Sequence, residues 1–345
     1  MDFASSAEAM TGVVSAACQG RGGPGHESGP MSTSAVAASG LRKAYKDKVV
    51  LDGIDLDVET GTIFSLLGPN GAGKTTTVNV LTTLIQADGG AARVAGHDVA
   101  TETKAVRAAI GVTGQFAAVD ELLTGQENLQ LMADLKRLGS GEANRVVTDL
   151  LERFDLTESA RKLASTYSGG MRRKLDLAMT LVGRPEIIFL DEPTTGLDPR
   201  SRRTMWDIIR QLVADGVTIF LTTQYLEEAD RLADRIAVLD QGRLVARGTP
   251  AELKRQIPGS HVRLQFASDL ELDAAMRLLP GSARAAEDDL ILRVPSDGGA
   301  KSVRALLNQL DDHSVDVEEF SVHTPDLDDV FLALTGRAST KENAR

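Results

Sequence analysis

Residues 68–75 read GPNGAGKT and match the pattern G-x-x-x-x-G-K-[ST], in which a glycine-rich backbone wraps around phosphate groups. The five residues before Gly68 read IFSLL, an apolar run typical of a buried strand. The glycines let backbone N–H groups turn inward, and the helix expected to begin near Gly73 points its positive dipole end at the phosphates. Lys74 would reach the β- and γ-phosphates, and the Thr75 hydroxyl would ligate Mg²⁺. We therefore predict a nucleoside-triphosphate site at this loop.

Two adjacent carboxylates, Asp191 and Glu192, follow a second apolar run, EIIFL, at residues 186–190. Open α/β sheets bind their ligands beyond the carboxyl ends of the strands, where both side chains would lie. We expect Asp191 to act at the Mg²⁺ ion and Glu192 to be the base that polarises the attacking water. Two such charges side by side are unfavourable unless a cation compensates one of them. A solvated acidic loop is the alternative that these two residues alone leave open.

A second anion-binding feature lies between these two motifs. Ser168, Gly169 and Gly170 open a helical pattern. Ser168 lies 94 positions after Lys74 and 23 before Asp191. Small residues at a helix N-terminus expose N–H groups and the positive end of the helix dipole to an anion. Because one chain already has a phosphate-binding loop, a second one implies a nucleotide held from both sides by two copies of the protein.

The elements that would position these residues follow an alternating pattern. Between residues 34 and 258, short apolar runs typical of strands, such as TIFLT at residues 218–222, alternate with helical patterns. This alternation predicts an α/β domain with a largely parallel sheet. Residues 125–182 are polar and helix-prone, which indicates an inserted helical subdomain.

The pattern changes in the last quarter of the chain. Residues 259–336 read as strand, helix, strand or hairpin, helix and strand, an order that predicts a small ferredoxin-like α+β unit. Residues 1–33 are rich in Ala, Gly and Ser and lack apolar periodicity, so we expect a disordered N-terminal extension. Residues 337–345 are expected to form a flexible tail.

The composition argues against several classes of protein. The 345 residues are 42% hydrophobic and 25% charged, as in soluble globular proteins. No run approaches the ~18 consecutive apolar residues of a membrane-spanning helix. A net charge of −11 argues against nucleic acid as a partner, because phosphate neutralisation needs clustered Lys and Arg. The single cysteine, Cys18, rules out an intrachain disulfide and fits a reducing compartment such as the cytosol.

Taken together, the motifs resemble those of the ATP-binding cassette (ABC) ATPases over nearly all of residues 35–258. The resemblance implies a P-loop NTPase fold with a mostly parallel sheet core, an antiparallel β subdomain and a helical subdomain, followed here by the small α+β unit. The matching positions are residues 68–75 for Walker A, residues 187–191 followed by Glu192 for Walker B, Ser168 to Gly170 for the signature, Gln115 for the Q-loop, Asp198 for the D-loop, and Tyr45 for the aromatic that stacks on adenine.

The resemblance also implies a role for each matched residue. Catalysis falls to Glu192 and Gln224, and Mg²⁺ binding to Thr75, Gln115 and Asp191. The working unit would be a homodimer that holds two Mg²⁺·ATP, each between the Walker motifs of one copy and the signature of the other. The signature residues are Ser168, Gly169, Gly170 and Met171, and Asp198 belongs to the D-loop. The residues expected to bind ATP are Tyr45, Gly68, Pro69, Asn70, Gly71, Ala72, Gly73, Lys74, Thr75 and Thr76.

Three longer runs are similar to the ATP-binding subunits of drug exporters that confer resistance to daunorubicin and doxorubicin: VTGQFAAVDELLTGQENL (112–129), LTTQYLEEADRLADRIAVLDQGR (221–243) and LDDVFLALTG (327–336). Such a subunit is a peripheral protein at the cytoplasmic face of the cell membrane. It energises a separate polytopic permease, and residues 116–123 would line part of the groove that receives this partner. The resemblance implies export of a drug or other hydrophobic small molecule, and hence antibiotic resistance. Lipid or polysaccharide transport, import, and a soluble ABC ATPase outside transport are the alternatives.

Position 224 departs from most of the ABC family, which carries a switch histidine there. Glutamine supplies an amide donor and a carbonyl acceptor but never a positive charge. Because charge-assisted bonds are about twice as strong as neutral ones, the exchange corresponds to a penalty on the order of 1–2 kcal/mol, or about ten- to thirtyfold in rate. The hypothesis is a working but slow ATPase. A degraded, non-hydrolysing site is the alternative, and the presence of Asp191 and Glu192 argues against it.

Several other residues leave two interpretations open. Met171 stands where many ABC proteins have Gln, with little expected loss because phosphate contacts rest on Ser168 and the two glycines. Arg172, Arg173 and Lys174 form either a solvated helical face or a phosphate-steering cluster. Trp206 is expected in the core. The ending LDDVFLALTG docks on the cassette or the membrane partner, or simply packs. We expect surface or turn positions, isolated and without metal-ligand spacing, for His97, His261, His313 and His323.

Overall fold

The computed structural model describes residues 34–115, 117–255, 260–285, 290–297, 299–323 and 326–335. The predicted N-terminal extension and flexible tail, the proposed boundary near residue 258, and Phe116 lie outside the described residues. Within the described part of the chain, no helix combines the length and the apolar character needed to cross a membrane.

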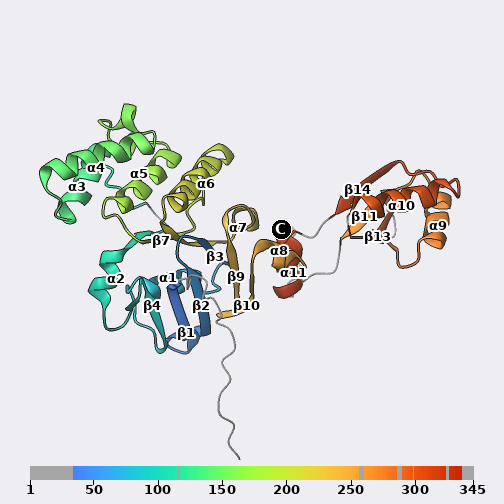
Figure 1. Ribbon diagram of the computed structural model, residues 1–345, viewed down its shortest axis with the longest axis horizontal. Helices are drawn as coiled ribbons and strands as arrows, with labels where there is room; N and C mark the ends of the chain where they lie inside the picture. The colour runs from blue at the N-terminus through green and yellow to red at the C-terminus, as the bar shows by residue number, and fades with distance from the viewer. Residues whose placement is uncertain are drawn as a thin grey trace, which may run out of the picture. The chain divides into compact units, whose positions relative to one another are not determined.

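A six-stranded sheet forms the centre of the fold (Figure 1). Five of its strands run parallel, and only the edge strand formed by residues 243–248 is antiparallel to its neighbour. The three middle strands are buried along their whole length, as their continuous apolar runs predict. In spatial order the strands are β10 (Arg243–Gly248), β9 (Arg235–Asp240), β3 (Ile63–Leu67), β8 (Thr218–Thr223), β7 (Ile187–Asp191) and β6 (Ile110–Thr113).

An antiparallel sheet covers one face of this central sheet. Its strands, in spatial order, are β2 (Lys48–Glu59), β1 (Ser34–Tyr45), β4 (Gly89–Val94) and β5 (His97–Asp98). Between the two sheets, Phe64, Phe189 and Phe220 pack together, with ring centroids 5.3 and 5.2 Å apart for the two contacts of Phe220. Leu41 and Leu51 join the same core.

Helices cover the opposite face. Alternate residues of the middle strands, including Ile63, Ile188 and Ile219, belong to a second core that they share with the helices. The helical block comprises α3 (Gly125–Leu135), α4 (Ser140–Arg153), the short 3-10 turns η1 (Thr157–Ser159) and η2 (Ala164–Thr166), and α5 (Gly169–Leu181), in agreement with the subdomain expected there. The remaining helices of this part of the chain are α1 (Lys74–Leu81), α2 (Thr103–Ala109), α6 (Pro199–Ala214), α7 (Leu226–Leu232) and α8 (Pro250–Arg255).

Local sequence explains where key helices begin. Thr124 caps α3 in a reciprocal capping box, since its side chain accepts from Glu127 N while Glu127 accepts from Thr124 N. Asp198 caps α6 and is followed by Pro199 at the first helical position. Ser168 caps α5. Each of these starts lies in or beside a motif with a proposed function.

A separate α+β unit with its own core follows the cassette. Its sheet is antiparallel throughout, in the order β12-β13-β11-β14, which is the ferredoxin-like order expected from the sequence. Val262, Leu264 and Leu292 lie at the centre of its core. The elements are β11 (His261–Gln265), α9 (Asp269–Leu278), β12 (Ala283–Arg284), β13 (Ile291–Pro295), α10 (Ala300–Asp311) and β14 (Glu319–His323).

The last helix, α11 (Leu327–Thr335), returns to the cassette. Its Leu327 and Val330 are buried in a cluster with Ala229 of α7 and Leu253 of α8. The LDDVFLALTG ending therefore packs on the cassette, one of the outcomes that the sequence left open. By sequence this segment belongs to the predicted C-terminal domain, whereas by packing α11 completes the cassette.

Candidate nucleotide-binding and catalytic site

The glycine-rich loop between β3 and α1 is packed so tightly that two of its glycines have no room for a side chain. A Cβ on Gly68 would lie 2.3 Å from the carbonyl oxygen of Leu239. Gly73, the residue before α1, has φ 116, and its Cβ would lie 2.9 Å from the carbonyl oxygen of Val50. The chain itself therefore demands glycine at both positions.

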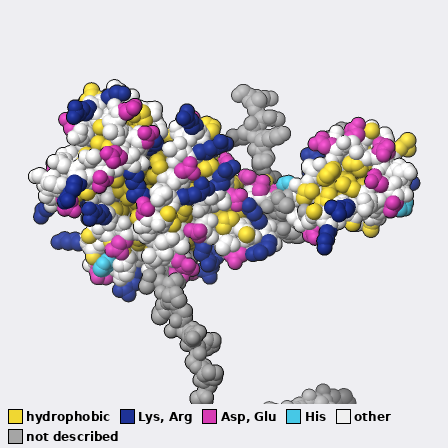
Figure 2. Space-filling model, turned by 45° about the horizontal axis from the view of Figure 1, so that its top comes forward, with side chains coloured by type: hydrophobic (Ala, Val, Ile, Leu, Met, Phe, Trp, Pro, Cys, Tyr) yellow, Lys and Arg dark blue, Asp and Glu magenta, His cyan; other side chains and the backbone are white. Residues whose placement is uncertain are grey.

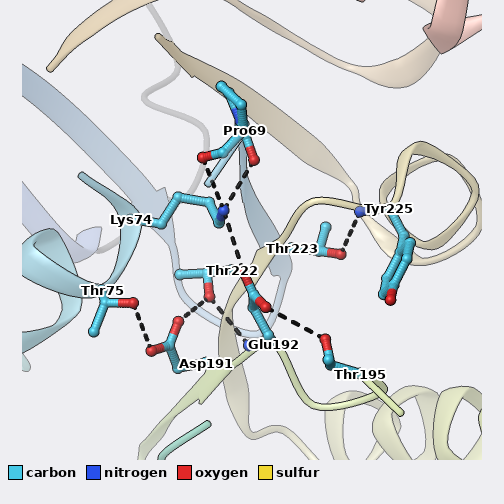
Figure 3. A network of polar contacts seen from close by, with 10 residues as sticks. Pro69, Lys74, Thr75, Asp191, Glu192, Thr195, Thr222, Thr223 and Tyr225 are labelled. Carbon is cyan, nitrogen blue, oxygen red and sulfur yellow. Dashed lines mark hydrogen bonds and ion pairs between the residues drawn. The ribbon is translucent and has the colours of Figure 1, made fainter. Parts of the chain in front are cut away.

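Lys74 and Glu192 meet at this loop (Figure 3). The buried Lys74 ammonium donates to the carbonyl oxygens of Gly68 at 2.9 Å and Pro69 at 3.2 Å. It also lies 3.2 Å from Glu192 Oε1, while Glu192 Oε2 accepts from the Thr195 hydroxyl at 3.3 Å. The residues that the sequence predicted for phosphate binding and for the general base are thus in direct contact.

Asp191 lies beside the first turn of α1. Its Oδ2 accepts from the Thr75 hydroxyl at 2.9 Å, and its Oδ1 accepts a short hydrogen bond from Thr222 (Figure 3). Two of the residues proposed to act at the Mg²⁺ ion, Thr75 and Asp191, are therefore adjacent, with Asp191 buried and Thr75 exposed.

Glu192 has a backbone conformation that is unusual for a residue with a side chain. Its φ is 51, in the left-handed region, which costs on the order of 1–3 kcal/mol and persists only where the surroundings fix it. The neighbouring strand β8 holds the backbone of Glu192: Glu192 N donates to Thr222 O at 3.1 Å and lies 3.2 Å from the Thr222 hydroxyl. The position of the proposed base is thus set by its backbone surroundings.

Gln224 directly follows β8, the strand that lies between β3 and β7. On one side, Gly68 N donates to the carbonyl oxygen of Thr223 at 3.3 Å. On the other side, Glu192 N donates to the carbonyl oxygen of Thr222. The half-buried Gln224 therefore follows a strand whose end bonds both the phosphate-binding loop and the backbone of the proposed base.

Gln115 and Tyr45, the predicted Q-loop and adenine-stacking residues, follow or end strands of two different sheets. Gln115 is exposed and lies two residues after Thr113 of β6. Because Thr113 pairs in register with Leu190 of β7, the backbone of Gln115 lies at the same end of the sheet as Asp191. Tyr45 ends β1 with 48% of its surface exposed, and the Lys43 ammonium lies 5.6 Å from the ring centroid. A ring this exposed is accessible for stacking on a base.

The signature turn is open to solvent. Ser168 and Gly169 are exposed, and Ser168 Oγ accepts from Met171 N at 3.3 Å. Among the described residues, no atom outside its chain neighbours and the backbone of its own helix would lie within 4 Å of a Cβ on Gly169, whereas a Cβ on Gly170 would lie 2.7 Å from Ser201 Oγ. The side chain of Met171 packs against the helical core.

Ser201 also connects the signature to the D-loop. Asp198 Oδ2 accepts from the Ser201 hydroxyl at 2.6 Å, and Asp198 Oδ1 accepts from the N–H groups of Arg200 and Ser201, both at 3.0 Å. These bonds, led by that of the Ser201 hydroxyl, hold the pKa of Asp198 below its usual value. The D-loop carboxylate and the signature turn therefore meet at one residue of the same chain.

Comparisons with known proteins place these features in a family. A model of the ABC transporter family matches residues 51–195, and one described as the C-terminal domain of DrrA1-3-like ATP-binding proteins matches residues 248–335. The daunorubicin resistance ATP-binding protein DrrA3 of Streptomyces coeruleorubidus is 48% identical over 307 residues, which cover 89% of this chain and 97% of that protein. The chain belongs to the DrrA family of ABC ATPases. It is therefore an ATPase that binds ATP.

Other DrrA-family proteins match at similar coverage. The daunorubicin/doxorubicin resistance ATP-binding protein DrrA of Streptomyces peucetius is 47% identical over 320 residues, covering 90% of this chain and 97% of that protein. Among solved structures, an ATP-binding subunit of an ABC transporter is 29% identical, with a TM-score of 0.58 over 64% of this chain and 92% of its own. A dimeric ATP-binding cassette in a post-hydrolysis state with ADP and Pi is 25% identical, with a TM-score of 0.57 over 62% and 98%.

In this DrrA-family cassette, the three basic residues after the signature have different surroundings. Arg172 is 39% exposed and pairs with Glu121 at 2.7 Å, and Lys174 lies 3.8 Å from Asp155. Arg173 is buried and donates to main-chain carbonyl oxygens and to Asp176. For Arg173, both sequence interpretations were wrong, because it belongs neither to a solvated face nor to a phosphate-steering cluster.

Glu228 of α7 is a buried site neighbour that the sequence did not single out. Its Oε1 accepts from the Thr194 hydroxyl at 2.8 Å and from Trp206 Nε1 at 3.0 Å. Burial raises its pKa, against the opposing effect of these bonds and of the Arg202 charge. Trp206 is in the core, as expected. The sequence gave little indication that Glu228 is buried, because two Glu residues at the start of a helix are normally exposed and are stabilised there by the helix dipole.

Two of the histidines predicted to be isolated are neighbours. His261 and His323 face each other across β11 and β14, with ring centroids 4.7 Å apart. His323 Nε2 also lies 3.0 Å from Asp329 Oδ2. This correction reflects a strand pairing that spacing along the sequence does not reveal.

The donor groups fit a magnesium ion carried by a nucleotide. Thr75 and Asp191 offer one hydroxyl and one carboxylate, and Mg²⁺ is commonly held by one or two protein ligands together with substrate phosphates and water. Among the described residues, no cluster of three or more His, Cys, Asp or Glu side chains could hold a metal ion on its own. The oxygen donors present thus suit Mg²⁺ when phosphate oxygens complete the set.

Proposed function

We propose that this chain is the ATP-hydrolysing subunit of an exporter that moves a drug or other hydrophobic small molecule through a separate membrane protein. The network around Lys74, Asp191 and Glu192 supports the hydrolytic part of this proposal. The names of the relatives support the cargo: two are resistance proteins for daunorubicin or doxorubicin, and a third, 34% identical, is the linearmycin resistance ATP-binding protein LnrL of Bacillus subtilis.

The geometry suggests how ATP would activate the base. The Lys74 ammonium contacts Glu192, and a triphosphate bound in the loop would compete for the same ammonium. Because a charge-assisted bond to phosphate is strong, we expect Lys74 to turn to the phosphates and Glu192 to become free to polarise water. The amide of Gln224 would then contact the terminal phosphate beside Glu192.

Mg²⁺ would be held by Thr75 and Asp191, with Gln115 as a further oxygen donor from the neighbouring strand edge. When bound, the ion would neutralise phosphate charge. The protein's own contribution is to fix these side chains: Thr222 holds Asp191 from β8, and the left-handed turn at Glu192 directs the base away from the strand.

We further propose that two copies close head to tail, so that Ser168, Gly169 and Gly170 of one copy contact the nucleotide of the other. The exposed, unobstructed signature turn supports this arrangement. A structural relative is described as dimeric with ADP and Pi, and this chain is similar to it over the cassette.

The membrane partner would bind near the loop after Gln115, at the cytoplasmic face of the membrane. Within residues 117–123, Leu122 is 85% exposed, so its apolar side chain is accessible to a partner. Phe116, which belongs to the same predicted groove, lies outside the described residues.

Replacement of Glu192 by Gln tests the proposed function. E192Q, co-expressed with its membrane partner, should bind ATP as well as wild type but lose at least ~100-fold in phosphate release and all ATP-driven uptake of a fluorescent anthracycline into inverted vesicles. E227Q is the matched control, because Glu227 is an exposed residue of α7 whose Oε1 lies 3.1 Å from Arg231 Nε. Unchanged hydrolysis in E192Q would reject the base assignment, and hydrolysis without anthracycline uptake in wild type would reject the cargo.

A further inference from the structure

Arg173 makes contacts on both sides of the proposed base. Its Nε donates to the carbonyl oxygen of Pro193 at 2.9 Å, and its Nη2 donates to the carbonyl oxygen of Asp191 at 3.3 Å. These two carbonyl groups flank Glu192, whose backbone is in the left-handed region. Arg173 thus binds one carbonyl group directly before Glu192 and one directly after it.

The same side chain reaches the loop that carries Gln115. Arg173 Nη1 donates to the carbonyl oxygen of Gly114 at 2.8 Å and lies 3.3 Å from Asp176 Oδ2. On the other side of Gln115, Ala118 N donates to Asp176 Oδ1 at 2.9 Å. The Arg173–Asp176 pair therefore holds the chain before and after Gln115.

This pair is buried, with Arg173 only 7% exposed and Asp176 only 3%. Burying two charges is unfavourable unless good geometry and further hydrogen bonds compensate, and apolar residues would often stabilise such a position as well or better. A planar guanidinium has five N–H donors in a fixed fork, so it can bind several carbonyl oxygens in one defined arrangement. Lysine, with a compact ammonium on a flexible stem, cannot reproduce that arrangement.

The pair also lies on the helix that begins at the signature. Ser168 caps α5, and Arg173 and Asp176 are the fifth and eighth residues of that helix. A helix rises 1.5 Å per residue and moves as a unit over such a length, so any displacement of the signature turn is carried to the pair. No other function proposed above uses these two residues.

We propose that Arg173 and Asp176 are positioning residues that make the placement of Gln115 and Glu192 depend on the placement of the signature helix. This inference rests on the proposed function, since it assumes that Glu192 is the base and that the signature meets the nucleotide of the twin subunit. Contact between the signature and that nucleotide would hold α5 in place, and the pair would hold the base of the same chain. Each subunit would thereby report occupancy of one ATP site to the other.

Conservative substitution of Arg173 separates positioning from mere support of the fold. R173K keeps the charge but loses the fork, so we expect a folded protein whose Kd for ATP changes less than about threefold. In the complex with the membrane protein, kcat should fall by about 10²-fold, the usual size for a misplaced catalytic group, with KM little changed and cooperativity in ATP lost. R172K is the matched control and should match wild type in all four quantities, because Arg172 is half exposed and pairs with Glu121.

Amide hydrogen exchange of the full chain tests the inference without relying on turnover. R173K should speed exchange about tenfold or more in peptides that cover residues 117–120 and 191–195, while peptides of α4 keep the wild-type rate. D176N should affect the Ala118 amide more than the Glu192 amide, because Asp176 contacts only the former.

Each outcome has one meaning. Faster exchange at both places together with a lower kcat in R173K supports the inference. If the wild-type complex does not hydrolyse ATP but R173K still exchanges faster at both places, the Arg173–Asp176 pair positions these segments and the proposed function is rejected. Wild-type kcat in folded R173K overturns the inference. So does a loss of kcat that only follows the fraction of unfolded protein, with exchange faster everywhere.

Discussion

The molecule has two helices that begin at glycine-rich turns suited to an anion, and their surroundings are opposite. At the start of α1, Gly68 and Gly73 are closed in by the backbone of neighbouring segments, and Lys74 is buried. At the start of α5, Ser168 and Gly169 are exposed, and space around Gly169 is free. The turn at α1 is therefore a closed cradle formed by one chain, whereas the turn at α5 presents its N–H groups to a ligand or subunit outside that chain.

This difference shows where each glycine is needed. At Gly73 the requirement comes from the fold, since a positive φ and nearby backbone atoms exclude a side chain. At Gly169 the fold imposes no such requirement, so a requirement there would have to come from a nucleotide or a second subunit. Gly170 is intermediate, because its neighbour is the Ser201 side chain.

The largest expected effect comes from G73A, which places a methyl group against Val50 O in a conformation that L residues rarely adopt. We expect destabilisation on the order of 2–4 kcal/mol in chemical denaturation and loss of ATP binding by the isolated chain. G139A is the matched control, because Gly139 has φ −65 and open space around its Cα. If G73A bound ATP like wild type, the closed cradle would not be the binding site.

G169A makes the matching test at the exposed turn that begins α5. The free energy of unfolding should change by less than ~0.5 kcal/mol and ATP binding to the isolated chain should be unchanged. ATPase activity of the assembled complex should fall about 10²-fold, because the added methyl group would separate the signature from the nucleotide of the twin. G141A provides the control in the first turn of α4, also in open space. Full activity in G169A would argue against a signature that acts across the dimer.

Q224H restores the histidine that most of the ABC family carries at this position, and it tests whether a positive charge there speeds hydrolysis. A histidine that becomes charged beside the terminal phosphate should raise kcat by about tenfold, and the gain should grow as pH falls toward ~6.5. Measurement of kcat from pH 6 to 9 checks both points, with E192Q/Q224H expected to stay inactive. A kcat equal to wild type at every pH would show that charge at this position does not limit the reaction.

The smallest expected effect concerns Glu228, the buried residue of α7 that accepts from the Thr194 hydroxyl and Trp206 Nε1. Burial raises its folded pKa, so its contribution to stability is fully present below the unfolded value near 4.5 and is lost as pH rises through the folded value. E228Q cannot ionise, and its unfolding free energy relative to wild type should therefore increase with pH, by on the order of 1 kcal/mol. Denaturant unfolding at pH 4.5 and pH 8 measures this change. A difference that does not vary with pH would show that Glu228 does not titrate in this range.

Much of the site could be predicted because its chemistry is local in sequence. The apolar runs before Gly68 and Asp191 are bounded by turn residues, so strand type and strand ends were both visible. Parallel strands then bring their carboxyl ends to one edge, which places Lys74, Asp191, Glu192 and Gln224 together without any knowledge of side-chain packing.

What the sequence could not supply depends on contacts between distant segments. Arg172, Arg173 and Lys174 are alike in type, and only the position of α5 against the end of β7 decides which of them is buried. The pairing of His261 with His323 requires β11 and β14 to be neighbours, although 62 positions separate them in the chain. The ending LDDVFLALTG could be singled out in the sequence, but which surface it covers is decided by its contacts with α7 and α8.

The α+β unit has apolar side chains at its surface. Figure 2 shows hydrophobic side chains at its surface, and its exposed large apolar residues include Leu270, Met276, Phe320 and Val322. Phe320 and Val322 belong to β14, which is an edge strand of its sheet. These residues are natural positions for polar substitutions if the protein is engineered for solubility.

The packing of α11 has a practical consequence for anyone who shortens this protein. A stop codon after α8 would remove Leu327 and Val330 and leave Ala229 and Leu253 facing water, so such a fragment should aggregate. An internal deletion that joins α8 to α11 through a short flexible linker would instead keep those apolar partners covered. The small unit is therefore better excised as an insertion than trimmed as a tail.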